Sequence, residues 1–285
     1  MPARLAPART VRCIGDSPLT GRLARLRARA GAATSSTLQY GIHGLRFSLH
    51  RTRVFLAGRL NPSTFLGLHL TIGLIVVAAA IWFFSALVDS VLDNATLVRW
   101  DIATDAWIHA RVTPGGTDVF HVITRLGSPG AMTVLAIIGA VVLIARGRPT
   151  MFVTWVAAFA GGGILDRVLK MLVHRSRPLY ATEHLRNVTF SFPSGHAMGS
   201  MIGILMLLHA LWIFRIVRGP ARAIVAVAGA VFVALVGISR VYLGAHYPSD
   251  VFGGWAVGAA WMGLCVSIAG IVLHRRGISV TSRAR

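Results

Sequence analysis

Residues 65–88 read FLGLHLTIGLIVVAAAIWFFSALV, an apolar run that contains no Asp, Glu, Lys or Arg. A helix of about 20 such residues is long enough to cross the hydrocarbon core of a bilayer. Five further apolar runs follow along the chain, at residues 129–145, 151–171, 197–214, 221–238 and 250–273. We therefore predict an all-α, polytopic membrane protein with six transmembrane helices.

The composition of the whole chain agrees with this class. Of the 285 residues, 55% are hydrophobic and 13% are charged, whereas about 25% of a soluble domain is charged. The net charge of +20 is compatible with nucleic-acid binding, but eleven of the 29 basic residues precede residue 60 and the others mainly flank apolar runs. This distribution favours anionic lipid headgroups, so we predict no nucleic-acid partner. The two cysteines, Cys13 and Cys265, provide neither a disulfide framework nor a metal cluster.

The basic residues also predict the orientation. Arginines are concentrated before residue 60, in the turns after the second and fourth apolar runs, and at the C-terminal end. By the positive-inside rule these four regions are cytoplasmic, and six spans place both termini there. The segment 89–128 carries five aspartates and three arginines, so we expect it outside.

Three regions of the chain are predicted from the same pattern. Residues 1–60 are expected to form a basic cytoplasmic tail, disordered for the most part, which contacts anionic lipid. Leucines recur on one helical face of residues 45–60, which indicates an interfacial helix; a featureless linker and, for the whole tail, an organelle transit peptide remain alternatives. Residues 61–275 form the six-helix membrane domain, and residues 276–285 a second basic cytoplasmic tail.

Three polar segments interrupt the apolar chain, at residues 170–178, 193–196 and 239–250. They follow the third run, precede the fourth, and lie between the fifth and sixth. The predicted topology places all three on the extracytoplasmic face. Lys170 in the first segment is the sole lysine among 29 basic residues. Basic residues are normally concentrated on the cytoplasmic face, so basic residues on the outer face indicate a role in a reaction or in ligand binding.

The cationic and small residues of these segments suit a phosphate. Lys170, Arg177 and Arg240 would form a pocket of positive charge, and guanidinium groups bind phosphate through two parallel hydrogen bonds. Ser194 and Gly195 precede the fourth run, where a helix N-terminus offers backbone N–H groups to an anion.

The two histidines and the aspartate suit a reaction at phosphorus. His246 and Asp250 are four residues apart, close enough for a carboxylate–imidazole hydrogen bond that would raise the basicity of the other ring nitrogen. His196, on another segment, could act as a general acid on the opposite side of the phosphoryl group.

Neighbouring polar residues have simpler interpretations. Asp166 lies one helical turn before Lys170, which predicts an ion pair that partly neutralises the lysine. His174 and Arg175 are either accessory phosphate ligands or ordinary loop residues, and we favour the second.

The pattern resembles a known family. Lys-x6-Arg-Pro at 170–178, Pro-Ser-Gly-His at 193–196 and Ser-Arg-x5-His-x3-Asp at 239–250 resemble the three signature motifs of the phosphatidic acid phosphatase type 2 superfamily. The likeness covers about residues 60–273, including the six-helix arrangement, and every motif position is matched in order. Soluble vanadate-binding haloperoxidases belong to the same superfamily, but six apolar runs favour its membrane branch.

The resemblance implies a metal-independent lipid phosphate phosphatase that needs no cofactor. It implies that His246 attacks phosphorus, Asp250 orients it, and His196 protonates the leaving oxygen. The residues implied to hold the phosphoryl oxygens are Lys170, Arg177, Ser194, Gly195 and Arg240. The implied substrates are undecaprenyl diphosphate, phosphatidate or phosphatidylglycerol phosphate, at the outer face of a bacterial plasma membrane. A lipid phosphotransferase using the same site and a non-catalytic lipid-phosphate binder remain alternatives.

Overall fold

The computed structural model describes residues 68–93, 96–182, 186 and 189–275, which all belong to one compact unit of the chain. The described residues form helices and contain no β-strand. The helices are α2 (Leu68–Leu92), α3 (Thr96–His109), α4 (Pro114–Leu126), α5 (Pro129–Ala145), α6 (Pro149–Val173), α8 (Gly195–Ile213), α9 (Ala221–Tyr242) and α10 (Pro248–Arg275). The predictions for residues 1–60 and 276–285 lie outside the described residues.

In the described part of the chain, each of the six apolar runs falls on one helix, namely α2, α5, α6, α8, α9 or α10, except that Phe214 follows the end of α8. Five stretches are long and apolar enough to cross a membrane: Gly73–Leu92, Pro114–Ala145, Gly195–Ile213, Ala221–Tyr242 and Pro248–Arg275. The second stretch joins α4 to α5. The 25-residue helix α6 is not among the five. Its last two turns contain Asp166, Arg167 and Lys170, which lower its hydropathy.

Proline and hydroxyl side chains mark where several helices begin. Helices α4, α5, α6 and α10 each have proline as their first residue, a position that lacks a helical N–H partner in any case. The Thr113 hydroxyl accepts a hydrogen bond from the Gly116 N–H, and the Ser128 hydroxyl accepts one from the Ala131 N–H, both at 3.2 Å. These caps fix the N-terminal ends of α4 and α5.

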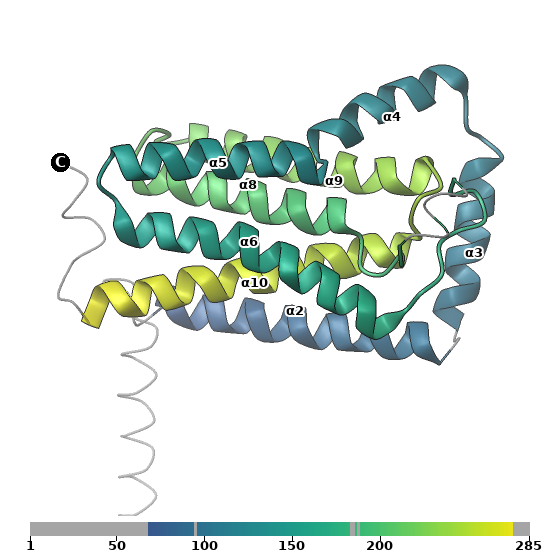
Figure 1. Ribbon diagram of the computed structural model, residues 1–285, viewed down its shortest axis with the longest axis horizontal. Coiled ribbons are helices and arrows are strands. Elements are labelled where there is room, and N and C mark those ends of the chain that lie inside the picture. Colours follow the sequence, from purple (N-terminus) through teal and green to yellow (C-terminus); the bar gives the residue numbers. More distant parts are fainter. Residues whose placement is uncertain (1–67, 94–95, 183–185, 187–188, 276–285) are drawn as a thin grey trace, which may run out of the picture. The chain divides into compact units, whose positions relative to one another are not determined.

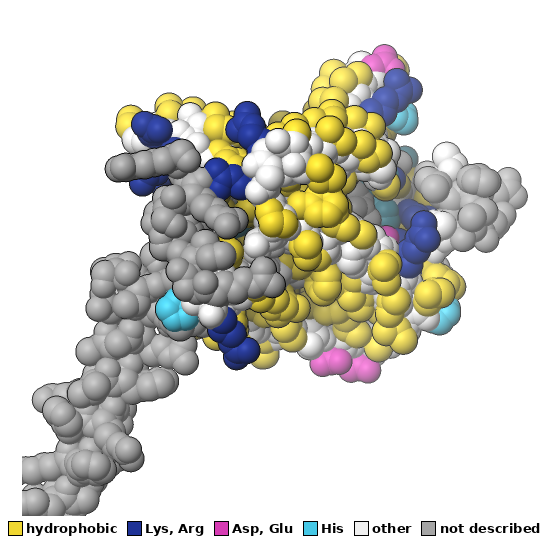
Figure 2. All heavy atoms as spheres, turned by 60° about the vertical axis from the view of Figure 1, so that its left-hand side comes forward, with side chains coloured by type: hydrophobic (Ala, Val, Ile, Leu, Met, Phe, Trp, Pro, Cys, Tyr) yellow, Lys and Arg dark blue, Asp and Glu magenta, His cyan; other side chains and the backbone are white. Residues whose placement is uncertain are grey.

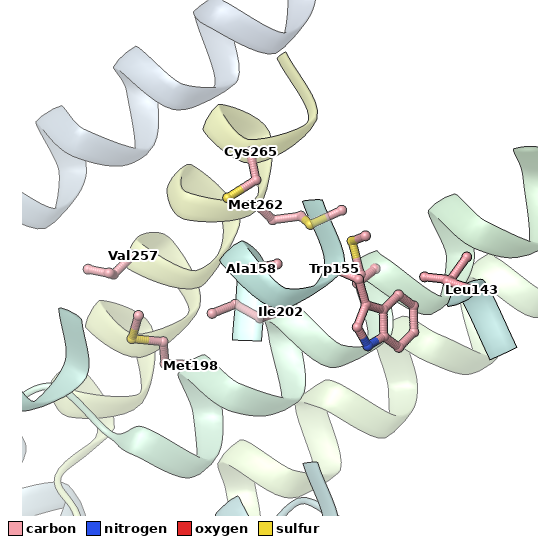
Figure 3. Packing of buried hydrophobic residues seen from close by; sticks show 9 residues of the cluster. Leu143, Trp155, Ala158, Met198, Ile202, Val257, Met262 and Cys265 are labelled. Atoms are coloured by element: carbon pink, nitrogen blue, oxygen red, sulfur yellow. The ribbon is translucent and has the colours of Figure 1, made fainter. Parts of the chain in front are cut away.

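Helix α10 is the centre of the bundle. It packs against α2, α6, α8 and α9, and at its first turns against α3. In Figure 1 the long helices run alongside one another while α3 lies across one end of them. The main apolar cluster comes from α5, α6, α8 and α10, and Figure 3 shows Trp155 and Met198 among its members. The indole N–H of Trp155 donates to the Ala136 carbonyl at 2.8 Å and so ties α6 to α5.

The outer surface carries many large apolar side chains. Large side chains on α2, α5 and α6 are strongly exposed, among them Trp82, Ile144 and Leu172. Figure 2 shows hydrophobic side chains over most of one face, with the charged side chains toward its margins. An apolar exterior of this extent is what lipid contact requires, since a soluble monomer rarely exposes such a patch.

Helices α3 and α4 occupy the segment 89–128, which we expected outside the membrane without assigning it structure. Helix α3 packs against α2, α9 and α10, and α4 packs against α9. The Tyr242 hydroxyl at the end of α9 accepts a hydrogen bond from the Thr113 N–H at 2.9 Å, at the start of α4. Both helices are therefore attached to the end of the bundle that carries the polar segments.

Candidate active site

The three polar segments meet at one end of the bundle, where α6 ends, α8 begins, α9 ends and α10 begins. His174 ends α6 in the left-handed conformation, at φ 52°. The segment that follows returns to α8, and the Ser194 N–H donates to the Asp250 carbonyl at 2.9 Å. A side chain at Gly254 would meet the Ser194 carbonyl at 2.6 Å, so only glycine allows α8 and α10 to approach this closely. The structure thereby brings all eight predicted residues together.

Lys170 lies in the last turn of α6 and has two partners. Its ammonium donates to the Asp166 carboxylate, which forms the predicted ion pair, and to the Pro193 carbonyl at 2.7 Å. A Cβ atom at Gly195 would lie 3.1 Å from the Asp166 carboxylate. A carboxylate therefore lies beside the N-terminus of α8, where an anion is favoured.

Arg177 connects the first segment to His246. Its Nη1 donates to the Ala245 carbonyl at 2.7 Å and lies 3.2 Å from His246 Nε2. Its Nε and Nη2 donate to the Thr189 hydroxyl at 3.1 and 2.8 Å. Because a guanidinium can only donate, the Nε2 that faces Arg177 is the unprotonated nitrogen of the imidazole.

The other nitrogen of His246 faces Asp250. The Nδ1 atom lies 3.4 Å from Asp250 Oδ2, within the distance of an ion pair, and makes no hydrogen bond. That oxygen also accepts a hydrogen bond from the Tyr247 N–H at 2.9 Å. A proton on Nδ1 directed at Asp250 leaves the lone pair on Nε2, which is the arrangement a nucleophilic histidine needs.

Electrostatics keep His246 neutral. Burial lowers its pKa to about 4, and the charges of Arg177 and Arg240 act in the same direction, while Asp250 opposes them. Burial also lowers the pKa of Arg177. An uncharged His246 near neutral pH retains the lone pair that attack requires.

Arg240 and Ser194 carry buried polar atoms that lack partners. Arg240, in the last turn of α9, donates from Nη1 to the Thr124 hydroxyl of α4 at 2.9 Å, and its Nε is unpartnered. Ser194 precedes α8, yet its hydroxyl makes no capping bond and is buried without a partner. His196 in the first turn of α8 lies within electrostatic range of Lys170, Arg177, Arg240 and His246. This combination of cations and unpaired donors suits an anion.

Four residues of the site lie outside the predicted set: Asp101, Thr124, Arg175 and Ser249. Arg175 is buried and bonded to Asp250, Ser249 and Asp101, so our interpretation of it as an ordinary loop residue was wrong. Its position between His174 and Ser176 in a polar motif segment was a usable signal. No sequence signal marked Asp101 or Thr124. Asp101 lies 74 residues from Arg175 in the sequence, and Thr124 lies 116 residues from Arg240.

The donor chemistry favours an anion over a metal. Across the described part of the chain, no three His, Cys, Asp or Glu side chains form a group that could hold a metal ion. The Arg177 guanidinium lies beside His246 Nε2, and the charges of Lys170, Arg177 and Arg240 all act on His196; such cations repel a metal ion and attract a phosphate.

Comparisons with known proteins identify the family of the chain. The sequence profile of the PAP2 superfamily matches residues 150–271. Phosphatidylglycerophosphatase B of Bacillus subtilis is 31% identical over 181 residues, which cover 62% of this chain and 86% of that protein. Undecaprenyl-diphosphatase of Sulfolobus acidocaldarius is 30% identical over 130 residues, which cover 42% of this chain and 56% of that protein.

A solved structure shares the fold. The crystal structure of a transmembrane PAP2-type phosphatidylglycerolphosphate phosphatase from Bacillus subtilis superposes with a TM-score of 0.56 at 28% identity, over 67% of this chain and 94% of that one. Together with the sequence relatives, this establishes the integral membrane character that the apolar helices indicate. The chain therefore belongs to the PAP2 superfamily, and it is a phosphatase.

Proposed function

We propose that this protein removes phosphate from a lipid phosphomonoester or diphosphate through a phosphohistidine on His246, without a metal ion. The observation that carries the proposal is the setting of the His246 ring, with Nε2 beside Arg177 and Nδ1 toward the buried Asp250. Phosphoryl transfer depends mainly on positioning and charge stabilisation, which this arrangement supplies.

The reaction has two balanced steps. His246 Nε2 forms a bond to phosphorus while the bond from phosphorus to the leaving oxygen breaks, and His196 donates its proton to that oxygen. A water then attacks the phosphorus, His196 takes one proton from it, and the phosphorus–nitrogen bond breaks to release phosphate. The oxygens of the phosphoryl group lie among Lys170, Arg177, Arg240 and the N-terminus of α8, where Ser194 and Gly195 contribute.

A cavity beside the site supports a lipid substrate. It has a volume of about 410 Å³ and is lined by apolar side chains of α5, α6 and α8, including Met132, Ile137 and Phe159. One end of it reaches Asp166 and Gly195, next to Lys170. An apolar chain in this cavity would place an attached phosphate at the cationic residues.

The location of the site supports an outward orientation. The turns that connect α5 to α6 and α8 to α9 carry Arg146, Arg148, Arg215 and Arg218, and they lie at the end of the bundle away from the site. By the positive-inside rule that end is cytoplasmic. We place the site at the outer face of a bacterial plasma membrane, with undecaprenyl diphosphate, phosphatidate or phosphatidylglycerol phosphate as substrate.

A substrate panel tests this proposal. Purified protein in detergent is assayed for phosphate release from these three lipids, with and without EDTA. We expect release from at least one lipid in both conditions and none from His246→Ala. The control is His121→Ala, an exposed histidine on α4. Release that persists in His246→Ala, or that EDTA abolishes, would contradict the mechanism.

A further inference from the structure

A buried ion-pair network lies directly behind the His246–Asp250 pair. Arg175 follows α6, and Asp101 comes from α3, outside the residues that match the family profile. Asp101 and Asp250 are fully buried, and Arg175 is 9% exposed. Buried charges of this kind are costly unless they are paired and hydrogen-bonded.

Asp101 uses both carboxylate oxygens. Its Oδ2 accepts a hydrogen bond from Arg175 Nη2 at 2.7 Å and another from the Ser249 hydroxyl. Its Oδ1 accepts the Ser249 N–H at 3.0 Å. Helix α3 is thereby attached to the first turn of α10, one residue before Asp250.

Arg175 connects this carboxylate to Asp250. Its Nη1 donates to Asp250 Oδ1 at 2.6 Å and to the Ser249 hydroxyl at 2.7 Å, and its guanidinium lies 4.4 Å from the centre of the Tyr247 ring. With Oδ1 held by Arg175, the other oxygen of Asp250 faces the Tyr247 N–H and His246 Nδ1. The guanidinium thus fixes the direction in which the carboxylate meets the imidazole.

Both terminal nitrogens of Arg175 are therefore occupied by protein partners. Arg177 Nη1 lies 3.2 Å from His246 Nε2, the charge of Arg240 also acts on His246, and Arg240 retains an unpartnered Nε. In Arg175, by contrast, Nη1 and Nη2 are both directed at the carboxylates of Asp250 and Asp101. A contribution to substrate binding would need it to abandon two buried carboxylates.

We infer that Arg175 and Asp101 are positioning residues, which orient Asp250 toward His246 and set how strongly that carboxylate supports the imidazole. The inference rests on the proposed function, because it assigns a task within the same phosphoryl transfer. Asp101 makes α3 part of the active site, so this helix outside the motifs supports the chemistry.

The local charge balance gives the network a measurable role. Asp105, one turn after Asp101, has a carboxylate oxygen that is buried without a partner. Burial, together with the charges of Asp101 and Asp250, raises the pKa of Asp105 to about 6. Arg175 is therefore the cation that offsets a group of carboxylates, and its removal increases the negative charge that acts on His246.

The ionisable groups facing His246 are few. They are Asp250 from α10, Arg177 from the segment after α6, Arg240 from α9 and His196 from α8. Arg175 acts on His246 through Asp250. Loss of Arg175 should make the imidazolium easier to form, and loss of the Asp101 charge should make it harder, so the two changes have opposite effects on the pH dependence.

The test compares full-length Arg175→Met, Arg175→Lys and Asp101→Asn in detergent, with dioctanoyl phosphatidate as the probe. We expect kcat to fall about 100-fold in Arg175→Met and about 10-fold in Asp101→Asn, because small misplacements of reacting groups have effects of this size. KM should change less than about threefold, since neither residue binds the phosphate. The acidic limb of kcat/KM should move to higher pH in Arg175→Met and to lower pH in Asp101→Asn.

Controls separate this inference from folding defects and from the proposed function. Arg125→Met and Asp118→Asn alter exposed residues of α4 and should match wild type. Arg175→Lys keeps the positive charge, and Asp101→Asn keeps the shape of the side chain. The kcat and KM of these two variants therefore test the inference if Arg175→Met does not fold. A raised KM with unchanged kcat, or both conservative variants within about twofold of wild type, overturns the inference. Activity that survives His246→Ala overturns the proposed function instead, whatever Arg175 does.

Discussion

The two sides of the His246 imidazole are built differently. On the Asp250 side, the side chains of Asp101, Arg175, Ser249 and Asp250 are bonded to one another within a buried network. Among the described residues predicted to bind the phosphate, the Ser194 hydroxyl and Arg240 Nε are buried without partners; toward Asp250, His246 Nδ1 makes no hydrogen bond but lies 3.4 Å from the carboxylate.

The difference separates residues that orient Asp250 from residues that bind the phosphate. A buried donor without a partner costs free energy unless a ligand satisfies it, so the Nε2 side is arranged for a group that arrives. On the Asp250 side, the carboxylates and Arg175 are bonded to protein partners and require no ligand. These bonds keep the Asp250 carboxylate oriented toward His246. Changes to the two sides should therefore damage different steps of the reaction.

The largest effect is expected from Asp250→Asn. The amide would present an N–H to His246 Nδ1 or lose its contact with Arg175, and either outcome disfavours the tautomer with a free Nε2 lone pair. We expect kcat to fall about 10³-fold or more, as for the equivalent change in a Ser-His-Asp triad. Single-turnover phosphate release measures it. The exposed Asp118→Asn is the matched control, and a loss of less than tenfold would show that Asp250 does not hold the tautomer.

On the opposite side, Arg240→Lys should act on phosphate binding. The ammonium cannot reproduce the fork that Arg240 directs between Thr124 and the anion site. We expect kcat/KM to fall about 100-fold, the usual effect of losing one donor to a developing charge. Inhibition by orthovanadate should weaken in parallel.

The control for Arg240→Lys is Arg125→Lys, an exposed arginine on α4. The acidic limb of the pH profile should stay close to that of wild type, because the positive charge is retained. A loss confined to kcat, with vanadate inhibition unchanged, would show that Arg240 orients catalytic groups and does not bind the phosphate. The contrast between the two sides would then be lost.

The sequence predicted the elements that depend on local pattern. All six apolar runs lie on helices, since a long run of apolar residues has few other ways to satisfy its backbone in a membrane. The ends were less predictable. Helix α9 continues past residue 238 to Tyr242, because the Ser239 hydroxyl bonds to the Val236 carbonyl of the same helix and Arg240 is held by Thr124 of α4.

The site was predictable where its residues form compact motifs and unpredictable where they do not. The eight predicted residues meet, and their catalytic roles stay predictions. Arg175 lies inside a motif segment, yet its partner Asp101 lies 74 residues earlier in a segment of mixed polarity. No periodicity links the two, because the contact arises only when α3 lies across the end of the bundle (Figure 1).

The pH dependence should distinguish the nucleophile from its surroundings. Burial lowers the pKa of His246 to about 4. Below that pH the ring takes up a proton and loses the lone pair on Nε2, so kcat/KM should fall tenfold per pH unit as the pH decreases and should be level above it. The profile is measured between pH 3.5 and 7 on dioctanoyl phosphatidate. An acidic limb near the ordinary histidine value of about 6.5 would show that the ring is not desolvated.

The same shift affects folding stability. An unfolded histidine binds a proton below about pH 6.5, whereas the folded one resists until about pH 4, so the free energy of unfolding should decrease as pH falls between these values. His246→Gln removes this contribution, and the difference between its thermal unfolding profile and that of wild type isolates it.

The smallest effect is expected from Thr124→Val, which connects the binding side to α4. The change keeps the shape of the side chain and removes the hydroxyl that accepts from Arg240 Nη1 at 2.9 Å. The charge of Arg240 remains, and a single lost hydrogen bond is worth about 1–2 kcal/mol, so kcat/KM should fall roughly 5- to 30-fold. Thr117→Val, on the same helix with a hydroxyl that bonds only to the nearby Thr113 carbonyl, should leave activity unchanged.

Because Thr124 orients a phosphate ligand while Asp101 orients the nucleophile's partner, Thr124→Val should weaken orthovanadate inhibition and Asp101→Asn should leave it unaltered. If both variants altered vanadate inhibition equally, the orientation of Asp250 and the binding of phosphate would not be separable. Helices α3 and α4 would then support both functions together.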